Sequence, residues 1–155
     1  MEEVKYIPGD LVTSKLVPAN IVCRITAVDQ ERRFVGRKGR LVGVAGIEGF
    51  DVDSSRYVYR VIFFNEIIPI PLTSEILKKN GWKKYICISE IWYSDEVFID
   101  GDKDDEKSYI YFELHHKGNC WDIFQRDELL RKGIKYVHQL QHLLFGLGLN
   151  HEIKV

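Results

Sequence analysis

The first half of the chain alternates apolar and polar residues, the pattern of β-strands that bury one face. Within Ile21–Val28 every second residue is apolar or small, so Ile21, Cys23 and Ile25 share one side of the predicted strand. Further strands are predicted over the other short apolar and aromatic runs, namely Leu11–Ser14, Arg40–Val44, Phe50–Val52 and Tyr57–Phe64.

The segments between these runs have the composition of turns and loops. A charged loop is predicted over Asp29–Gly39, and a glycine-bounded turn is predicted between Val44 and Phe50. Short strands with closely spaced turns favour a small closed or nearly closed antiparallel barrel. Gly9-Asp10 before an apolar residue is common at the start of SH3-like barrels, so by analogy we expect an SH3-like barrel over residues 1–68.

A short helix is predicted to link this barrel to the rest of the chain. Pro69 and Pro71 keep Ile67–Leu72 extended. Thr73 is a good N-cap for a helix over Thr73–Asn80, which Asn80-Gly81 ends. Trp82 is then placed to pack beneath the end of the helix.

The second half returns to strands and closes on a helix. Strands are predicted over Tyr85–Tyr93, Glu96–Ile99, Tyr109–His115 and Cys120–Gln125, with a hairpin turn at Lys117-Gly118-Asn119, a helical turn at Asp127–Arg131 and an edge strand at Glu152–Val155. Tyr136–Gly146 has an apolar stripe at helical spacing. The predicted class is therefore α+β: an SH3-like antiparallel β-barrel, a linking helix, an antiparallel sheet and a C-terminal amphipathic helix. We expect residues 69–155 to pack with the barrel as one compact unit.

Composition narrows the setting of the protein. The formal charge of −1 gives no overall attraction to nucleic acid or anionic membranes. Cys23, Cys87 and Cys120 have no metal-ligand spacing and are interpreted as reduced thiols. The acidic start is not that of a secretory signal, and the longest apolar run, Leu143–Leu149, is far short of the roughly 20 residues of a membrane span. A cytoplasmic protein is expected.

Two motifs together resemble a group of small uncharacterised proteins from bacteriophages and mobile elements of gut bacteria. One is Ile68–Leu77 with its Pro-Leu-Thr helix start, which continues to Asn80-Gly81-Trp82, and the other is Tyr136–Gln141, which reads Tyr-Val-His-x-Leu-Gln. The resemblance covers roughly residues 9–147 in order. It implies a phage-like context, and hence the host cytoplasm, but no catalytic residue. Small phage proteins of this kind often block host defences by binding a host protein or a nucleotide signal.

A basic segment is the first candidate binding site. Its five cations are Arg32, Arg33, Arg37, Lys38 and Arg40, and Gly36 and Gly39 lie among them. Guanidinium groups bind phosphates through two hydrogen bonds, and glycines let backbone N–H groups approach an anion. The functional interpretation is a phosphate clamp, and the alternative is a solvated charged loop.

Aromatic residues on predicted strands form the second candidate. Tyr57, Tyr59, Trp92 and Trp121 could stack on a base. Aromatic residues on strands also serve as core residues or cross-strand pairs, so this alternative stays open. A nucleotide site requires the basic segment and the aromatic residues to lie close together in the fold.

Metal binding and catalysis have weaker signals. His138 and His142 are spaced for one helix face, but a third ligand is missing, and a structural role is favoured. Asp100, Asp102 and Asp104 resemble only the start of a calcium loop, and a solvated acidic hairpin tip is favoured for residues 100–107. Glu113 with Asp122 could act as an acid–base pair, although exposed strand carboxylates are simpler. No enzyme activity, cofactor or metal is expected.

The leading functional hypothesis is a non-enzymatic phage-type counter-defence protein that binds and sequesters a nucleotide-derived signalling molecule. Because one 155-residue chain encloses a small molecule poorly, a homo-oligomer with pockets at subunit interfaces is expected. Two alternatives stay open. One is an inhibitor that binds a host defence protein through the acidic loop and exposed aromatic residues, and the other is a nucleic-acid-binding accessory protein.

Overall fold

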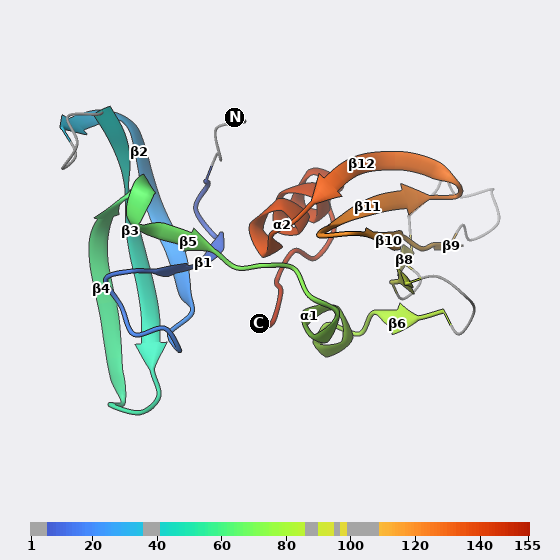
Figure 1. The fold of residues 1–155 in the computed structure, drawn as a ribbon, viewed down its shortest axis with the longest axis horizontal. Helices are drawn as coiled ribbons and strands as arrows, with labels where there is room; N and C mark the ends of the chain where they lie inside the picture. Colours follow the sequence, from blue (N-terminus) through green and yellow to red (C-terminus); the bar gives the residue numbers. More distant parts are fainter. Residues whose placement is uncertain (1–5, 36–40, 86–89, 95–96, 99–108) are drawn as a thin grey trace.

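In the described part of the chain, two five-stranded antiparallel sheets, two α-helices and a short 3₁₀ turn make up most of the fold (Figure 1). The computed structural model describes residues 6–35, 41–85, 90–94, 97–98 and 109–155. The first sheet has the order β4-β3-β2-β1-β5 and is curled. Its strands are β1 (Leu11–Ser14), β2 (Cys23–Val35), β3 (Leu41–Asp51), β4 (Arg56–Phe63) and β5 (Ile67–Pro69). The predicted α+β class is confirmed.

Two strands of this sheet are longer than the sequence indicated. The predicted loop Asp29–Gly39 is wrong over its first part, because β2 continues to Val35 and pairs Phe34 with Val42 and Val35 with Leu41. Residues 36–40 lie outside the described residues. Local polarity does not prevent a strand when the adjacent strand supplies the backbone hydrogen bonds.

The predicted turn between Val44 and Phe50 is also wrong, because β3 runs through it without a break. Its glycines allow close packing instead of turning the chain. A Cβ added at Gly49 would lie 2.9 Å from the Ile21 side chain and 2.9 Å from the Val22 carbonyl oxygen. Glycine within a strand often marks such a close approach.

The link between the sheets follows the prediction. After a 3₁₀ turn, η1 (Phe64–Glu66), and strand β5, helix α1 (Ser74–Lys79) begins where the Thr73 hydroxyl accepts a hydrogen bond from the Ile76 N–H. The helix ends at Asn80, and Gly81 has a φ of 82°, which glycine adopts without strain. Trp82 is buried beside the helix.

The second sheet has the order β12-β11-β10-β7-β6, with a separate pair β8-β9. These strands are β6 (Lys83–Lys84), β7 (Ile91–Tyr93), β8 (Val97–Phe98), β9 (Tyr109–Ile110), β10 (Glu113–Lys117), β11 (Cys120–Gln125) and β12 (Glu128–Ile134). The hairpin at Gly118-Asn119 is confirmed. The helical turn predicted at Asp127–Arg131 is wrong. Arg126 and Asp127 both have positive φ and form a tight hairpin turn into β12.

Helix α2 (Val137–Gly146) confirms the predicted C-terminal helix and lies between the two sheets (Figure 1). The predicted edge strand Glu152–Val155 is wrong. The side chain of Asn80 bonds both the N–H and the carbonyl oxygen of Lys154, and the Lys79 ammonium donates to the Val155 carbonyl oxygen. Side chains of Lys79 and Asn80 therefore form hydrogen bonds with backbone groups that, in an edge strand, would pair with a neighbouring strand.

The apolar core has two parts that divide near residue 68. The first lies under the curled sheet and includes Val12, Ile25, Ile47 and Ile62. The second lies between the other sheet and the helices, and among the described residues of the N-terminal part only Leu11 joins it. Within the described ranges, no helix is both long enough and apolar enough to cross a bilayer.

Candidate functional site

The outer face of the first sheet presents aromatic side chains to solvent. Strand alternation places Ile62 in the core and its neighbours on β4 outside. Tyr57 is 86% exposed and Tyr59 is 62% exposed, so both phenol rings are available to a ligand. Tyr57 lies directly opposite Phe50 on β3, with ring centroids 5.0 Å apart at 62°. This is an edge-to-face aromatic pair on an open surface.

A groove of about 320 Å³ begins at this aromatic pair and runs across β3 and β2. It is lined by Leu11, Val22, Arg24, Glu48, Gly49, Phe50 and Tyr57. An aromatic wall and a guanidinium group therefore lie in one groove. An aromatic ring can stack on a base, and a guanidinium group can bind a phosphate.

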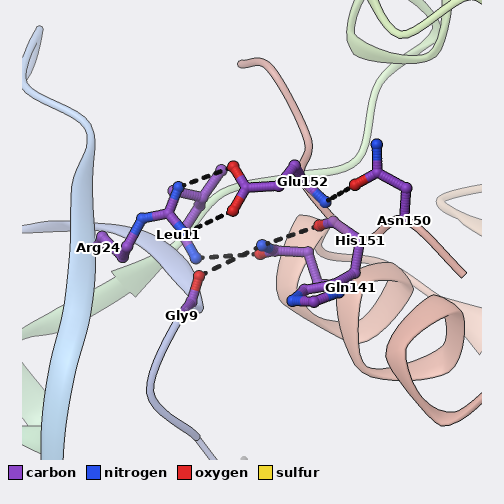
Figure 2. A network of polar contacts seen from close by, with 7 residues as sticks. All are labelled: Gly9, Leu11, Arg24, Gln141, Asn150, His151 and Glu152. Carbon is purple, nitrogen blue, oxygen red and sulfur yellow. Dashed lines mark hydrogen bonds and ion pairs between the residues drawn. The ribbon is translucent and has the colours of Figure 1, made fainter. Parts of the chain in front are cut away.

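Arg24 is held in place by the C-terminal segment. Its Nη1 and Nη2 donate to the two carboxylate oxygens of Glu152 at 3.0 and 3.1 Å (Figure 2). The hydrogen bonds to Glu152 raise the pKa of Arg24, and those from Arg24 lower the pKa of Glu152. Both side chains are exposed enough for solvent and for a competing anion to reach them.

Gln141 of α2 joins three chain segments behind this ion pair (Figure 2). Its Oε1 accepts from the Leu11 N–H at 3.0 Å, while its Nε2 donates to the carbonyl oxygens of Gly9 and His151 at 3.3 and 3.4 Å. Gln141 is buried. The network fixes residues 9–11 and the C-terminal segment to the same helix, and so positions Glu152 against Arg24.

Tyr59 lies along the outer face rather than standing away from it. A Cβ added at Gly46 would lie 3.2 Å from the Tyr59 hydroxyl and 2.8 Å from the Thr26 hydroxyl. The Thr26 Oγ1 is buried and has no hydrogen-bond partner among the described residues. Gly46 therefore leaves the room that the Tyr59 hydroxyl occupies.

A second polar cluster lies where α2 meets the N-terminal segment. The His142 Nε2 is 2.7 Å from an oxygen of buried Asp10, whose other oxygen accepts from the Ile7 N–H. The His138 ring is buried between Tyr6 and Tyr136, and its Nδ1 has no partner in the described part of the chain. Burial lowers the pKa of His138 to about 4.

This cluster has the features of a structural contact. The recess beside His142 measures only about 60 Å³. Burial and the Asp10 carboxylate raise the pKa of Tyr6 to about 12. The His138 and His142 rings are 5.7 Å apart, and no group of three or more His, Cys, Asp or Glu within the described ranges could hold a metal ion.

The basic segment is described only in part. Arg32 and Arg33 lie on β2, the strand that also carries Arg24. Arg37, Lys38 and Arg40 fall outside the described residues, as does the acidic segment 100–107.

The structure separates the four aromatic residues predicted for the ligand site. Tyr57 and Tyr59 share the outer face of the first sheet. Trp92 and Trp121 are buried in the core of the second sheet, and the Trp121 indole donates to the Leu72 carbonyl oxygen at 3.0 Å. Because they are covered by their own fold, the two tryptophans offer no stacking surface beside Tyr57.

Glu113 and Asp122 are each bound to other groups. Glu113 Oε2 is 2.9 Å from the His115 Nε2. Asp122 is buried, accepts from the Gly133 N–H at 2.9 Å, and contacts the Lys117 ammonium at 3.1 Å. The hydrogen bond from the Gly133 backbone lowers the pKa of Asp122. These contacts indicate that both carboxylates have a structural role.

Three site residues were not singled out from the sequence. Arg24 lies between Cys23 and Ile25, so the alternation already placed it on the outer face. Phe50 was assigned to a short separate strand, which concealed its pairing with Tyr57. Glu152 gave no signal, because its partner is 128 residues away.

Comparison with known proteins gives no assignment: no family model matches the chain, and neither the curated proteins nor the solved structures contain a match.

Proposed function

We propose that this chain is a non-enzymatic binding protein that holds a nucleotide-derived signalling molecule in the groove between Tyr57 and Arg24. One observation carries the proposal: an exposed aromatic pair, Tyr57 with Phe50, and a guanidinium group line the same groove. With the resemblance to phage proteins, the proposed role is counter-defence by sequestration in the cytoplasm. The finer fold proposal is that the curled first sheet is an SH3-like half-barrel.

The chemistry of the groove supports a nucleotide more than a purely apolar ligand. Stacking of a base on an aromatic ring contributes about 1–3 kcal/mol. The Arg24 guanidinium already binds the two oxygens of Glu152, and a phosphate group offers the same two-oxygen geometry. The ligand phosphate would therefore compete with Glu152 for Arg24.

The groove is open along its length, so one chain alone would cover such a ligand poorly. A second copy of the chain would be needed for sequestration, which is why the proposal includes a homo-oligomer. Arg32 and Arg33 lie on the same strand, β2, eight and nine residues beyond Arg24.

The test is a thermal-shift screen with cyclic nucleotides and ADP-ribose-type compounds. We expect at least one of them to raise the melting temperature of the wild-type protein, and Tyr57→Ala to abolish the shift. Tyr85→Ala is the matched control, because Tyr85 is also exposed and forms a comparable ring pair with Tyr93 at 4.8 Å. No shift with any compound, or an equal loss of the shift in both variants, would overturn the proposal.

A second candidate function is direct inhibition of a host protein. Val52 and Tyr57 are 76% and 86% exposed, and exposed apolar side chains of this kind are also typical of protein–protein contact surfaces. The same screen separates the two functions, because a protein-binding inhibitor would show no melting shift with any nucleotide.

A further inference from the structure

The outer strands of the two five-stranded sheets differ in how they are protected. An unpaired strand edge invites pairing with another chain, and natural proteins block such edges with proline, lysine, other charges or short strands. Strand β5 has three residues and ends in Pro69. Strand β6 consists of Lys83 and Lys84, and β12 carries charges including Arg131 and Lys132.

Strand β4 is the fourth outer strand, and it has little such protection. It is eight residues long, contains neither proline nor lysine, and is apolar or aromatic at every position except Arg56 and Arg60. In the described part of the chain β3 is its one strand partner. Figure 1 shows β4 at the left side of the molecule, on the far side of the first sheet from the second sheet.

We propose that β4 pairs antiparallel with β4 of a second copy of this chain, with Tyr59 at the two-fold axis. The pairing would join the two curled sheets edge to edge into one continuous sheet. The proposal stands on the strand edge and does not depend on a ligand in the groove.

The residue pattern of β4 selects this register. Residues directly opposite each other in an antiparallel pair lie on the same face of the sheet. With Tyr59 opposite itself, Tyr57 lies opposite Val61, so exposed apolar side chains meet across the outer face. Arg60 then lies opposite Val58 and no two arginines oppose each other.

The neighbouring registers are less favourable. Moving the axis by one residue toward the C-terminus puts Arg60 opposite Arg60, and moving it by one toward the N-terminus puts Arg56 opposite Arg60. Like charges directly opposite each other destabilise a strand pair. A half-step sets Tyr59 opposite Arg60, which places outer-face residues of one copy beside inner-face residues of the other.

The same reasoning limits the assembly to two copies. After β4 has paired with its symmetry mate, the outer strands of the joined sheet are the two copies of β5. Each of these has only three residues and includes Pro69, which has no N–H to donate. The structure therefore favours a closed dimer over an open chain of subunits.

Sedimentation equilibrium on the full chain tests the proposal. We expect a concentration-dependent monomer–dimer equilibrium, and we expect Tyr59→Lys to weaken dimerisation by about tenfold or more, because it sets two ammonium groups opposite each other. Val52→Lys is the control: Val52 is more open to solvent than Tyr59, at 76% against 62%, but lies in the turn before β4, so this variant should dimerise like wild type. A monomeric wild type, open-ended oligomers, or equal effects of both lysines would overturn the proposal.

A cysteine cross-link tests the register without relying on a destabilising change. Opposed Cα atoms in an antiparallel pair are about 4.5–5.5 Å apart, which a disulfide can bridge. Mild oxidation should therefore convert Tyr59→Cys into a covalent dimer, while Val52→Cys and the wild type, with its own three cysteines, should stay uncrosslinked. Absence of a Tyr59→Cys dimer, or equal cross-linking of Val52→Cys, would contradict the register.

Discussion

Arg24 and Glu152 form a two-hydrogen-bond ion pair across 128 residues of sequence, with N–O distances of 3.0 and 3.1 Å. The pair connects a strand of the first sheet to the C-terminal segment, which Gln141 and Asn80 hold in place. It also occupies the guanidinium group that lines the groove. The ion pair is therefore a contact between the two halves of the fold, and under the proposed function Glu152 would compete with the ligand phosphate for Arg24.

The first prediction separates these two roles. Glu152→Gln should tighten binding of a phosphate-bearing nucleotide, because it frees the Arg24 guanidinium, whereas Arg24→Gln should weaken it. Neither change should alter the free energy of unfolding much, because exposed ion pairs contribute little to stability. Isothermal titration and urea unfolding of both variants provide the measurements. Weaker binding by Glu152→Gln would contradict competition at Arg24.

The second prediction concerns Gln141. Gln141→Ala removes three hydrogen bonds and leaves the Leu11 N–H buried without its partner. We expect a loss of about 2–3 kcal/mol in the free energy of unfolding. Urea unfolding measures this loss, and Lys132→Ala, an exposed change on β12, serves as the control. If Gln141→Ala were as stable as Lys132→Ala, the network would not join the segments energetically.

The third prediction is a pH dependence that arises from His138. Burial lowers its pKa in the folded state from 6.5 to about 4, so between these values the unfolded chain binds more protons than the folded one. The contribution of neutral His138 to the free energy of unfolding is fully present above pH 6.5 and is lost as the pH falls toward 4. This loss amounts to roughly 3 kcal/mol.

The matched variant for this prediction is His138→Leu, since the Nδ1 makes no hydrogen bond among the described residues. Urea unfolding at pH 7 and pH 4.5 should show a smaller loss of stability for the variant than for the wild type. Identical losses would show that His138 does not carry this part of the pH dependence.

The fourth prediction distinguishes core tryptophans from ligand-binding tyrosines. Trp121→Phe should destabilise the fold by about 1–3 kcal/mol, because it removes the hydrogen bond to the Leu72 carbonyl oxygen and shrinks a buried side chain. It should leave nucleotide affinity unchanged. Tyr57→Ala should abolish nucleotide binding and leave the free energy of unfolding nearly unchanged. A loss of nucleotide affinity in Trp121→Phe would contradict this assignment and return Trp121 to the ligand site.

Local signals predicted a good part of the fold. Thr73 caps α1 as its sequence context indicates, and Gly118-Asn119 forms the hairpin turn. Helix α2 follows its apolar stripe, with Val137, Leu140 and Leu144 buried. Each of these features depends on residues within one or two turns of the chain, which is why sequence reasoning reached them.

The features that sequence reasoning missed depend on distant partners. Glycines at 46 and 49 indicated a turn, but they serve close packing against β2 and β4. Trp92 and Trp121 are of a residue type that often contacts ligands. They are buried here because the helices pack on the second sheet. Glu152 binds Arg24 because the two halves of the chain pack together, and no local sequence pattern predicts a contact between residues so far apart in the sequence.

The central claim is that the groove at Tyr57 and Arg24 binds a nucleotide. The most direct measurement is native mass spectrometry of the freshly purified protein, mixed with the nucleotide that the thermal-shift screen identifies. We predict a wild-type complex with one nucleotide per chain, no such complex for Tyr57→Ala, and an unchanged complex for Tyr85→Ala. A wild-type protein that carries no nucleotide, or a complex that survives in Tyr57→Ala, would contradict it.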